Sequence, residues 1–377
     1  MMTLHCPAKR HIRPDGGHRT SDNRQRRLAA LARSLRVAVM LPSLFALAFF
    51  VIRQPEVAGF TIFGTFAHLV MVNYDPTWRV RSAECAMLTG LGAVGVGLGT
   101  LASANVWFAV SGAIVIGFLA EFSKLVAGRI AVIRTALLLA FMLAVAIPSP
   151  VPSVRPNLEG WLLSGIAAQL ALLSLWIRFG NICGVGNDRS IYESVTAPLG
   201  LPSFSARIRN AAGAGMAMGL AILLTRLMKV EHTFWVVLGV LPVLNATQIS
   251  ATRTFWREQA GTLIGFLIGV SLVAVIGAHQ TWYWLLVPVI TFTAAYAASA
   301  GFIAGQAGFT VFAVVLFCIL LPQEDDVGIR RVEDIALGGA VGLVVSWLRH
   351  VSELQAMSRA NSRQQPRARH PALAIRS

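Results

Sequence analysis

Four arginines stand in two short polar segments that separate long apolar stretches. Arg79 and Arg81 lie in NYDPTWRVRS, and Arg253 and Arg257 lie in NATQISATRTFWRE. A guanidinium group binds a carboxylate through two parallel hydrogen bonds, so arginines at the mouth of a pathway would attract organic anions. Arginines beside apolar stretches also anchor a chain to lipid headgroups and set its orientation. The sequence leaves both interpretations open, a substrate-attracting vestibule and topology signals alone.

Other ionisable residues lie inside or at the ends of apolar stretches, where a charge is costly and suggests function. His68, in FGTFAHLVMV, is either a neutral core histidine or a proton relay. Glu84 and Glu258 open apolar stretches, where a carboxylate complements a helix N-terminus or takes part in proton coupling. Arg134 either faces a central pathway or extends back to the interface. Asp334 joins His68 and Glu84 as a candidate for proton coupling.

Glycines recur at four-residue spacing after the second arginine pair. Gly261, Gly265 and Gly269, together with Thr262, would share one face of a helix. Such a face allows the backbone of a neighbouring membrane helix to approach closely, so we expect a helix-packing motif here. Asn245 and several glutamines would either line a pathway or bond between helices: Gln169, Gln248 and Gln306.

The chain carries no arrangement typical of catalysis or of cofactor binding. Its four cysteines, Cys6, Cys85, Cys183 and Cys318, form no CxxC pair and have no metal-site spacing. A glycine-rich loop ending in Lys-Ser/Thr is missing, so ATP-driven pumping by this chain alone is not expected. We expect neither an enzyme activity nor a metal or cofactor.

The composition is that of an integral membrane protein. Of the 377 residues, 55% are hydrophobic and 13% are charged, whereas soluble domains carry about 25% charged residues. Apolar stretches of roughly 17–22 residues suit helices that cross about 30 Å of hydrocarbon, and the alternating segments of membrane barrels are missing. The expected fold class is therefore an all-α integral membrane protein.

The net charge of +15 resides mainly at the two ends. Residues 1–36 contain nine Lys and Arg against two acidic residues, and residues 349–377 contain six Arg against Glu353. This distribution predicts that both termini lie in the cytoplasm, next to anionic lipid. Nucleic-acid binding is not expected, because no folded basic module or interleaved aromatic residues accompany the arginines.

The apolar stretches form two sets of six. The first set occupies 35–177 and follows a basic cytoplasmic tail at 1–34. A cytoplasmic linker at 178–205 leads to the second set at 206–349, and a basic cytoplasmic tail at 350–377 follows. This predicts about 12 transmembrane helices, at about 35–52, 57–73, 84–102, 104–122, 130–147, 158–177, 206–228, 232–248, 258–277, 280–298, 301–321 and 331–349.

The two sets resemble each other at a nearly constant offset. Trp107 matches Trp282 at 175 residues, and Pro148 matches Pro322 at 174. Because six is even, both sets would enter the membrane in the same direction. The pattern therefore predicts two parallel six-helix repeats related by an axis along the membrane normal.

The loops and span ends complete this topology. Cytoplasmic loops would carry eight basic residues and the opposite loops six, among them Arg330 and Arg331, which acidic neighbours offset. Aromatic clusters at the span ends are expected to form interfacial belts: Trp107-Phe108, Trp282-Tyr283-Trp284 and Phe234-Trp235.

The segment HTFWVVLGVLPVLNATQISATRTFWREQAGTLIG resembles the fusaric acid resistance (FUSC) and aromatic acid exporter family. Its members show an apolar-aromatic helix, a polar loop, an Arg-bearing turn and a Gly-Thr-x-x-Gly helix, here Gly261, Thr262 and Gly265. RRVEDIALGGAVG, residues 330–342, resembles the family's last span. In two departures, Glu258 stands where members commonly carry Arg, and only the linker and a short tail stand where larger members carry a soluble domain.

The resemblance implies a transporter of the bacterial inner membrane that exports small organic carboxylic acids, aromatic ones among them. Its driving force would be a proton or charge gradient. Its partners would be the lipid bilayer, a small organic anion, and a periplasmic adaptor protein or further copies of the chain. A passive organic-anion channel with arginine rings and a non-transporting membrane partner protein are the alternatives.

Overall fold

A computed structural model describes residues 16–72, 74, 77–123, 129–146, 154–179, 204–230, 233–245, 248–277, 279–320 and 327–364. Within these residues the protein contains α-helices and short connections and no strand. Nearly all of the predicted linker, 178–205, lies outside the described part.

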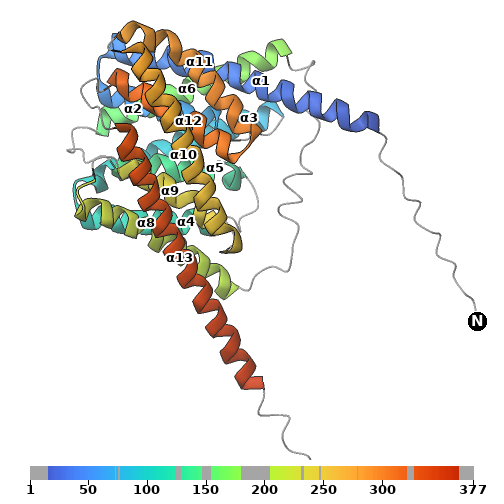
Figure 1. Ribbon diagram of the computed structural model, residues 1–377, viewed down its shortest axis with the longest axis vertical. Helices are drawn as coiled ribbons and strands as arrows, with labels where there is room; N and C mark the ends of the chain where they lie inside the picture. The colour runs from blue at the N-terminus through green and yellow to red at the C-terminus, as the bar shows by residue number, and fades with distance from the viewer. Residues whose placement is uncertain are drawn as a thin grey trace, which may run out of the picture.

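Twelve α-helices occur in the described residues (Figure 1). They are α1 Gly16–Ala46, α2 Pro55–Leu69, α3 Trp78–Ser103, α4 Val106–Phe122, α5 Arg129–Ala146, α6 Val154–Phe179, α8 Phe204–Leu227, α9 Thr233–Asn245, α10 Gln248–Ile276, α11 Gln280–Ala300, α12 Phe302–Leu320 and α13 Val327–Gln364. A π-helical segment, Leu47–Ile52, continues α1.

Among the described residues, seven helical segments are long and apolar enough to cross a membrane: Arg27–Ile52, Trp78–Ser103, Arg207–Leu227, Ser250–Ile276, Gln280–Ala300, Phe302–Leu320 and Arg330–Ser352. Three shorter helices, α4, α5 and α9, are also apolar. The described part of the chain therefore shows a multi-pass, all-helical membrane protein, with fewer full-length spans than the twelve expected.

The predicted spans at 57–73 and 232–248 correspond to the short helices α2 and α9, of 15 and 13 residues. At about 1.5 Å per residue, neither helix covers a hydrocarbon core of about 30 Å. Most of their described side chains are buried against other helices. A high hydropathy indicates that a segment is shielded from water but does not say by what. Much of the apolar surface of α2 and α9 is shielded by other helices rather than by lipid.

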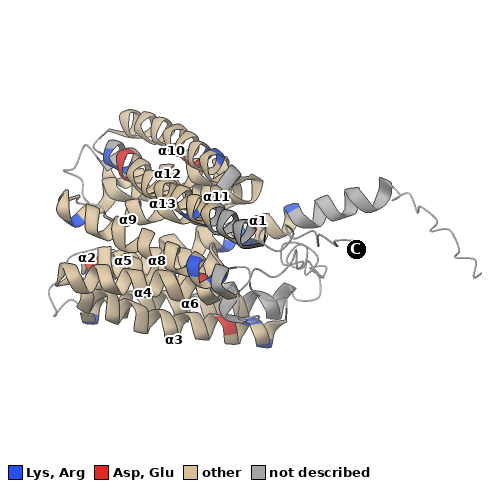
Figure 2. Ribbon diagram, turned by 90° about the horizontal axis from the view of Figure 1, so that it is seen from below, with Lys and Arg blue, Asp and Glu red and all other residues tan. Residues whose placement is uncertain are grey.

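The first and last helices extend beyond the predicted span ends. The predicted boundary at 34/35 lies inside α1, and the one at 349/350 lies inside α13. In Figure 1 the start of α1, in blue, and the end of α13, in red, both project from the helical body. Figure 2 shows that most of the described ribbon carries neither basic nor acidic residues.

Helix pairs within each set of six pack in corresponding ways. In the first set, α3 packs on α5 and on α6, and α2 packs on α6. In the second set, α10 packs on α12 and on α13, and α9 packs on α13. The sets also contact each other, through α4 on α8 and through α1 on α11. Each set thus contributes its first and fourth helices to the contact with the other.

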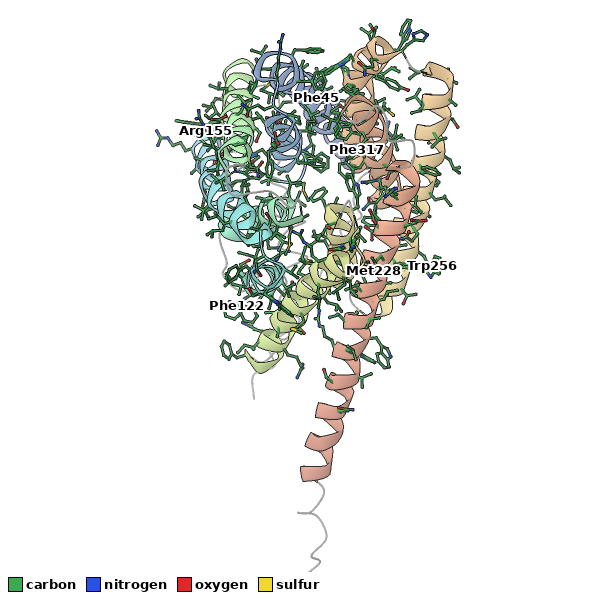
Figure 3. The ribbon with its side chains drawn as sticks, turned by 90° about the vertical axis from the view of Figure 1, so that its left-hand side faces the viewer. Phe45, Phe122, Arg155, Met228, Trp256 and Phe317 are labelled. Atoms are coloured by element: carbon green, nitrogen blue, oxygen red, sulfur yellow. The ribbon has the colours of Figure 1, made fainter. Side chains whose placement is uncertain are left out.

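Aromatic side chains fill several of these contacts. Phe45 of α1 stacks on Trp284 of α11, with 4.7 Å between the ring centroids. Phe45 and Phe317 lie among the helices in Figure 3, whereas Arg155 and Trp256 point away from the body. Trp256 is 65% exposed.

Candidate functional site

An aromatic cluster lies where α2, α9 and α12 meet. Phe63 of α2 contacts Phe234 of α9, with 4.8 Å between ring centroids. Phe66 of α2 stacks on Phe309 of α12 at 4.7 Å, and Trp235 of α9 lies edge-on to Phe309 at 6.1 Å. These rings join a helix of the first set to two helices of the second, so they lie between the two sets.

The guanidinium group of Arg331, on α13, extends into this cluster. Its Cζ lies 3.9 Å from the centroid of the Trp235 ring and 4.9 Å from that of Phe309. Arg331 is 1% exposed, and its Nε donates a hydrogen bond to Thr310 Oγ1 at 3.3 Å. The aromatic faces stabilise the cation by attraction to their π-electrons. This arrangement fixes the plane of the guanidinium group.

Both terminal nitrogens of Arg331 lack an acceptor among the described residues. The Thr310 hydroxyl, which accepts from Nε, donates in turn to the Gln306 carbonyl oxygen at 2.9 Å. Buried donors are almost always satisfied in native proteins, and an arginine with two free terminal nitrogens presents a fork that matches a carboxylate. Arg331 is therefore the strongest candidate for an anion-binding group in the described part of the chain.

Two buried acidic residues accompany Arg331. Glu258 of α10 is 1% exposed, and its Oε1 accepts a hydrogen bond from Gln306 Nε2 at 3.4 Å. Asp334 lies three residues after Arg331 on the same face of α13 and is also buried. Both carboxyl groups interact electrostatically with Arg331. The site thus combines one cation and two acidic groups from two helices.

A second polar location lies where α4, α5, α8 and α9 meet. Arg134, Thr135 and Glu121 line a cavity of about 30 Å³ there, and apolar side chains and small residues form the rest of its wall. A cavity of this size holds at most a few water molecules, so an aromatic acid does not fit in it. Arg134 thus lies between the two sets, beside a small, partly open cavity.

The other predicted arginines lie apart from the Arg331 site. Arg79 is exposed at the start of α3, 5.4 Å from the Trp78 ring centroid, and Arg81, two residues on, is half-buried. Arg253 and Arg257 are both exposed on the first turns of α10. The positive charges of Arg81 and Arg36 of α1 are close enough to repel each other.

The residues predicted for proton coupling fall in three places. His68 is buried in α2, with Nδ1 2.7 Å from the Gly64 carbonyl oxygen and Nε2 3.1 Å from Thr89 Oγ1. Glu84 is buried in α3, and Asp334 belongs to the Arg331 site.

Asn245, which was predicted to line a pathway or to bond between helices, is the last residue of α9, and its side chain lies outside the described part.

The glycine motif of α10 lies against α12. A Cβ atom on Gly261 would come within 2.7 Å of the Ile303 carbonyl oxygen, and one on Gly265 would overlap the Ala307 carbonyl oxygen. On Gly269 a Cβ would lie 3.1 Å from Val314 Cβ. Thr262 is buried beside these glycines. The close approach of α12 brings Gln306 and Thr310 next to Glu258 and Arg331.

Two expectations from the sequence are wrong at this site. Arg331 was expected in an outer loop, but it lies inside α13 and is buried. Phe234 and Trp235 were expected in an interfacial belt, but both are buried between the helix sets. By contrast, Trp107 and Trp282 are exposed. One feature of the sequence could have indicated that Arg331 is buried. Arg331 and Asp334 share a helix face with Gly338, and a glycine on that face is typical of close packing against another helix.

Comparisons with known proteins gave one match. The family model described as "Fusaric acid resistance protein-like" matches residues 220–345, which include α9 to α12, Arg331 and its partners Trp235, Phe309, Thr310, Glu258 and Asp334. Neither a curated protein nor a solved structure matches the chain. Among the described residues, no three His, Cys, Asp or Glu side chains come together as a metal site would require. From residue 220 to residue 345, about a third of the chain, the protein is similar to the fusaric acid resistance protein-like family.

Proposed function

We propose that the protein is a transporter of the bacterial inner membrane that exports small organic carboxylic acids, aromatic acids among them. The observation that supports this proposal most is Arg331, a buried cation with two unpartnered terminal nitrogens between two aromatic faces. A carboxylate would supply the acceptors that these nitrogens lack, and the N–H groups of Arg331 would replace the water that the carboxylate loses on leaving solution. The family match at residues 220–345 supports the same function.

The two short helices support the location of this site. Transport proteins often bind their substrate near the middle of the membrane, where short or interrupted helices from corresponding positions of two repeats meet. α2 and α9 are the second helices of their sets, are the two shortest in the described part, and meet at the aromatic cluster beside Arg331. The site therefore lies where a central pathway between the sets would pass.

Two six-helix repeats would form the walls of this pathway. Two features support a duplicated unit: the corresponding contacts within the two sets, and the packing of the first helix of each set on the fourth helix of the other. Relative movement of the repeats would then expose the Arg331 site to one side of the membrane at a time. The basic ends of the chain would lie in the cytoplasm. A periplasmic adaptor or further copies of the chain would extend the route outward.

Transport by purified protein in liposomes tests this function. Vesicles are loaded with unlabelled benzoate, and entry of labelled benzoate is followed in exchange for it. We expect saturable exchange by the wild type and its loss in Arg331→Gln. Arg330→Gln removes the exposed neighbouring arginine and is the matched control, which should exchange at the wild-type rate.

The results separate the possible functions. Exchange that saturates and requires substrate on both sides supports a transporter. Linear flux that follows the membrane potential would instead indicate a passive anion channel. If vesicles with wild-type protein exchange no organic acid from a panel of benzoate, 4-hydroxybenzoate, picolinate and hexanoate, the proposed function is wrong.

A further inference from the structure

Unsatisfied groups of both kinds occur around Arg331. The two terminal nitrogens of Arg331 are donors without an acceptor among the described residues. Oε2 of Glu258, which accepts when the carboxyl group is ionised, has no hydrogen-bond partner there, and both side chains are 1% exposed. An unsatisfied buried donor or acceptor is costly, and more so when it is charged. A ligand that carries only a carboxylate would satisfy Arg331 and leave Glu258 without a donor.

The charges lead to the same conclusion. With both acids ionised, Arg331, Glu258 and Asp334 carry a net charge of −1 among them. A simple anion would add a second unbalanced negative charge to a buried site, where charges interact far more strongly than in water. A ligand with one negative and one positive group adds no net charge.

Among the side chains that the structure describes, no charged group other than Arg331 compensates Glu258 from the helices packed on α10. These helices are α9, α12 and α13. α9 contains no titratable residue, and α12 contains only Cys318. On α13, Arg331 and Asp334 are the buried charged residues, whereas Arg330 and Glu333 are exposed. On α10 itself, Arg253 and Arg257 are exposed.

We propose that the preferred substrates are amino-substituted, ring-bearing carboxylic acids that are zwitterions at neutral pH. Their carboxylate binds the terminal nitrogens of Arg331, and their ammonium group donates to Glu258 Oε2. This inference rests on the proposed function and narrows its substrate class. Glu258 is then a specificity-determining residue that makes simple anions weaker substrates than zwitterions, because a site with a buried acceptor disfavours ligands that cannot donate to it.

Two acids of nearly equal shape test this proposal. 4-(Aminomethyl)benzoate is a zwitterion at pH 7, and 4-ethylbenzoate replaces its ammonium group with a methyl group. The apparent KM of each compound is measured by exchange in liposomes that contain the full-length protein. We expect the apparent KM of the wild type to be at least about tenfold lower for the zwitterion than for 4-ethylbenzoate. This ratio corresponds to a cost of about 1.4 kcal/mol for leaving the buried carboxylate without a donor.

Glu258→Gln removes the charge of the acceptor and retains its size. We expect this variant to lose the preference, by weaker binding of the zwitterion and stronger binding of 4-ethylbenzoate. Glu333→Gln, an exposed carboxylate on α13, is the matched control and should retain the preference. Gel filtration and thermal unfolding in detergent establish that each variant is folded. If Glu258→Gln does not fold, Glu258→Asp, which withdraws the carboxylate by one methylene, should still lower the preference several-fold.

Failure of this inference differs from failure of the proposed function. A wild type that exchanges 4-ethylbenzoate as well as the zwitterion, with a ratio that Glu258→Gln leaves unchanged, overturns the substrate class and leaves a carboxylate transporter. A loss of preference in Asp334→Asn but not in Glu258→Gln would show that Asp334, rather than Glu258, binds the ammonium group, and it also overturns the inference. If the wild type exchanges no acid at all, both proposals fail.

Discussion

Gly338 of α13 lies directly against the carbonyl oxygen of Val236 of α9. A Cβ atom built on Gly338 would overlap that oxygen, and one on Gly239 of α9 would overlap the Ile335 carbonyl oxygen. The two helices therefore approach each other through glycines on both sides. Arg331 and Trp235 lie on these same two helices, so the close approach helps to set their 3.9 Å contact.

Replacing Gly338 should therefore disturb both stability and transport. We expect Gly338→Ala to lower stability by about 1–3 kcal/mol, because the added methyl group meets backbone that cannot move aside cheaply. Unfolding in detergent measures the change. Gly90→Ala is the control, since no atom lies within 4 Å of a Cβ at that position. Equal melting temperatures for the two variants would contradict the inferred close approach.

A second prediction concerns Arg226, at the end of α8. One terminal nitrogen, Nη2, donates to the Val145 carbonyl oxygen at 3.0 Å and to the Ser103 carbonyl oxygen at 3.3 Å. Both acceptors lie in the last turns of first-set helices, where carbonyl groups lack partners within the helix. We expect Arg226→Gln to lower stability by about 1–3 kcal/mol, the range for hydrogen bonds to charged groups.

Chemical unfolding in detergent measures this loss, and Arg257→Gln, which alters an exposed arginine of α10, is the control. A loss no larger in Arg226→Gln than in Arg257→Gln would show that the two hydrogen bonds do not hold the sets together.

The sequence predicted the helical membrane class because that class follows from composition and stretch length alone. It also placed Asp334 and the motif of Gly261, Gly265 and Gly269 on helices. Its placement of Glu258 at a helix start was wrong, because α10 begins at Gln248 and Glu258 lies in its interior. It did not predict the partners of these residues, because a one-dimensional pattern does not tell protein from lipid as the apolar surroundings. Arg331 shows this clearly: an arginine beside an acidic loop looks solvated until α9 and α12 are packed against it. The sequence also did not predict that α9 is too short to span the membrane, because its apolar residues are buried by protein.

The exposed arginines of α10 should act differently from Arg331. We expect the double change Arg253→Gln and Arg257→Gln to leave stability within about 0.5 kcal/mol of the wild type, because both side chains are exposed. Exchange of benzoate should slow modestly at low salt and approach the wild-type rate at high salt, since surface charges that attract anions are screened. Rates compared at about 0.01 M and 0.5 M salt test this. Unchanged rates at both concentrations would make these residues topology signals alone.

The contact between Trp235 and Arg331 should set the affinity of the site. Trp235→Phe retains a ring in the same place but has a weaker attraction for the guanidinium group, because indole binds cations best among the aromatic side chains. We expect the apparent KM for a carboxylate to rise by about three- to tenfold, corresponding to about 0.6–1.4 kcal/mol, with little change in maximal exchange rate. Exchange kinetics in liposomes separate these two quantities.

Trp256→Phe, which changes an exposed tryptophan of α10, is the control and should leave both quantities unchanged. A role of Trp235 in packing alone would lower the melting temperature and the amount of active protein, and hence the maximal rate, without raising KM. The opposite pattern, a raised KM at constant maximal rate, requires that the indole ring holds the guanidinium group in the orientation in which it receives the substrate carboxylate.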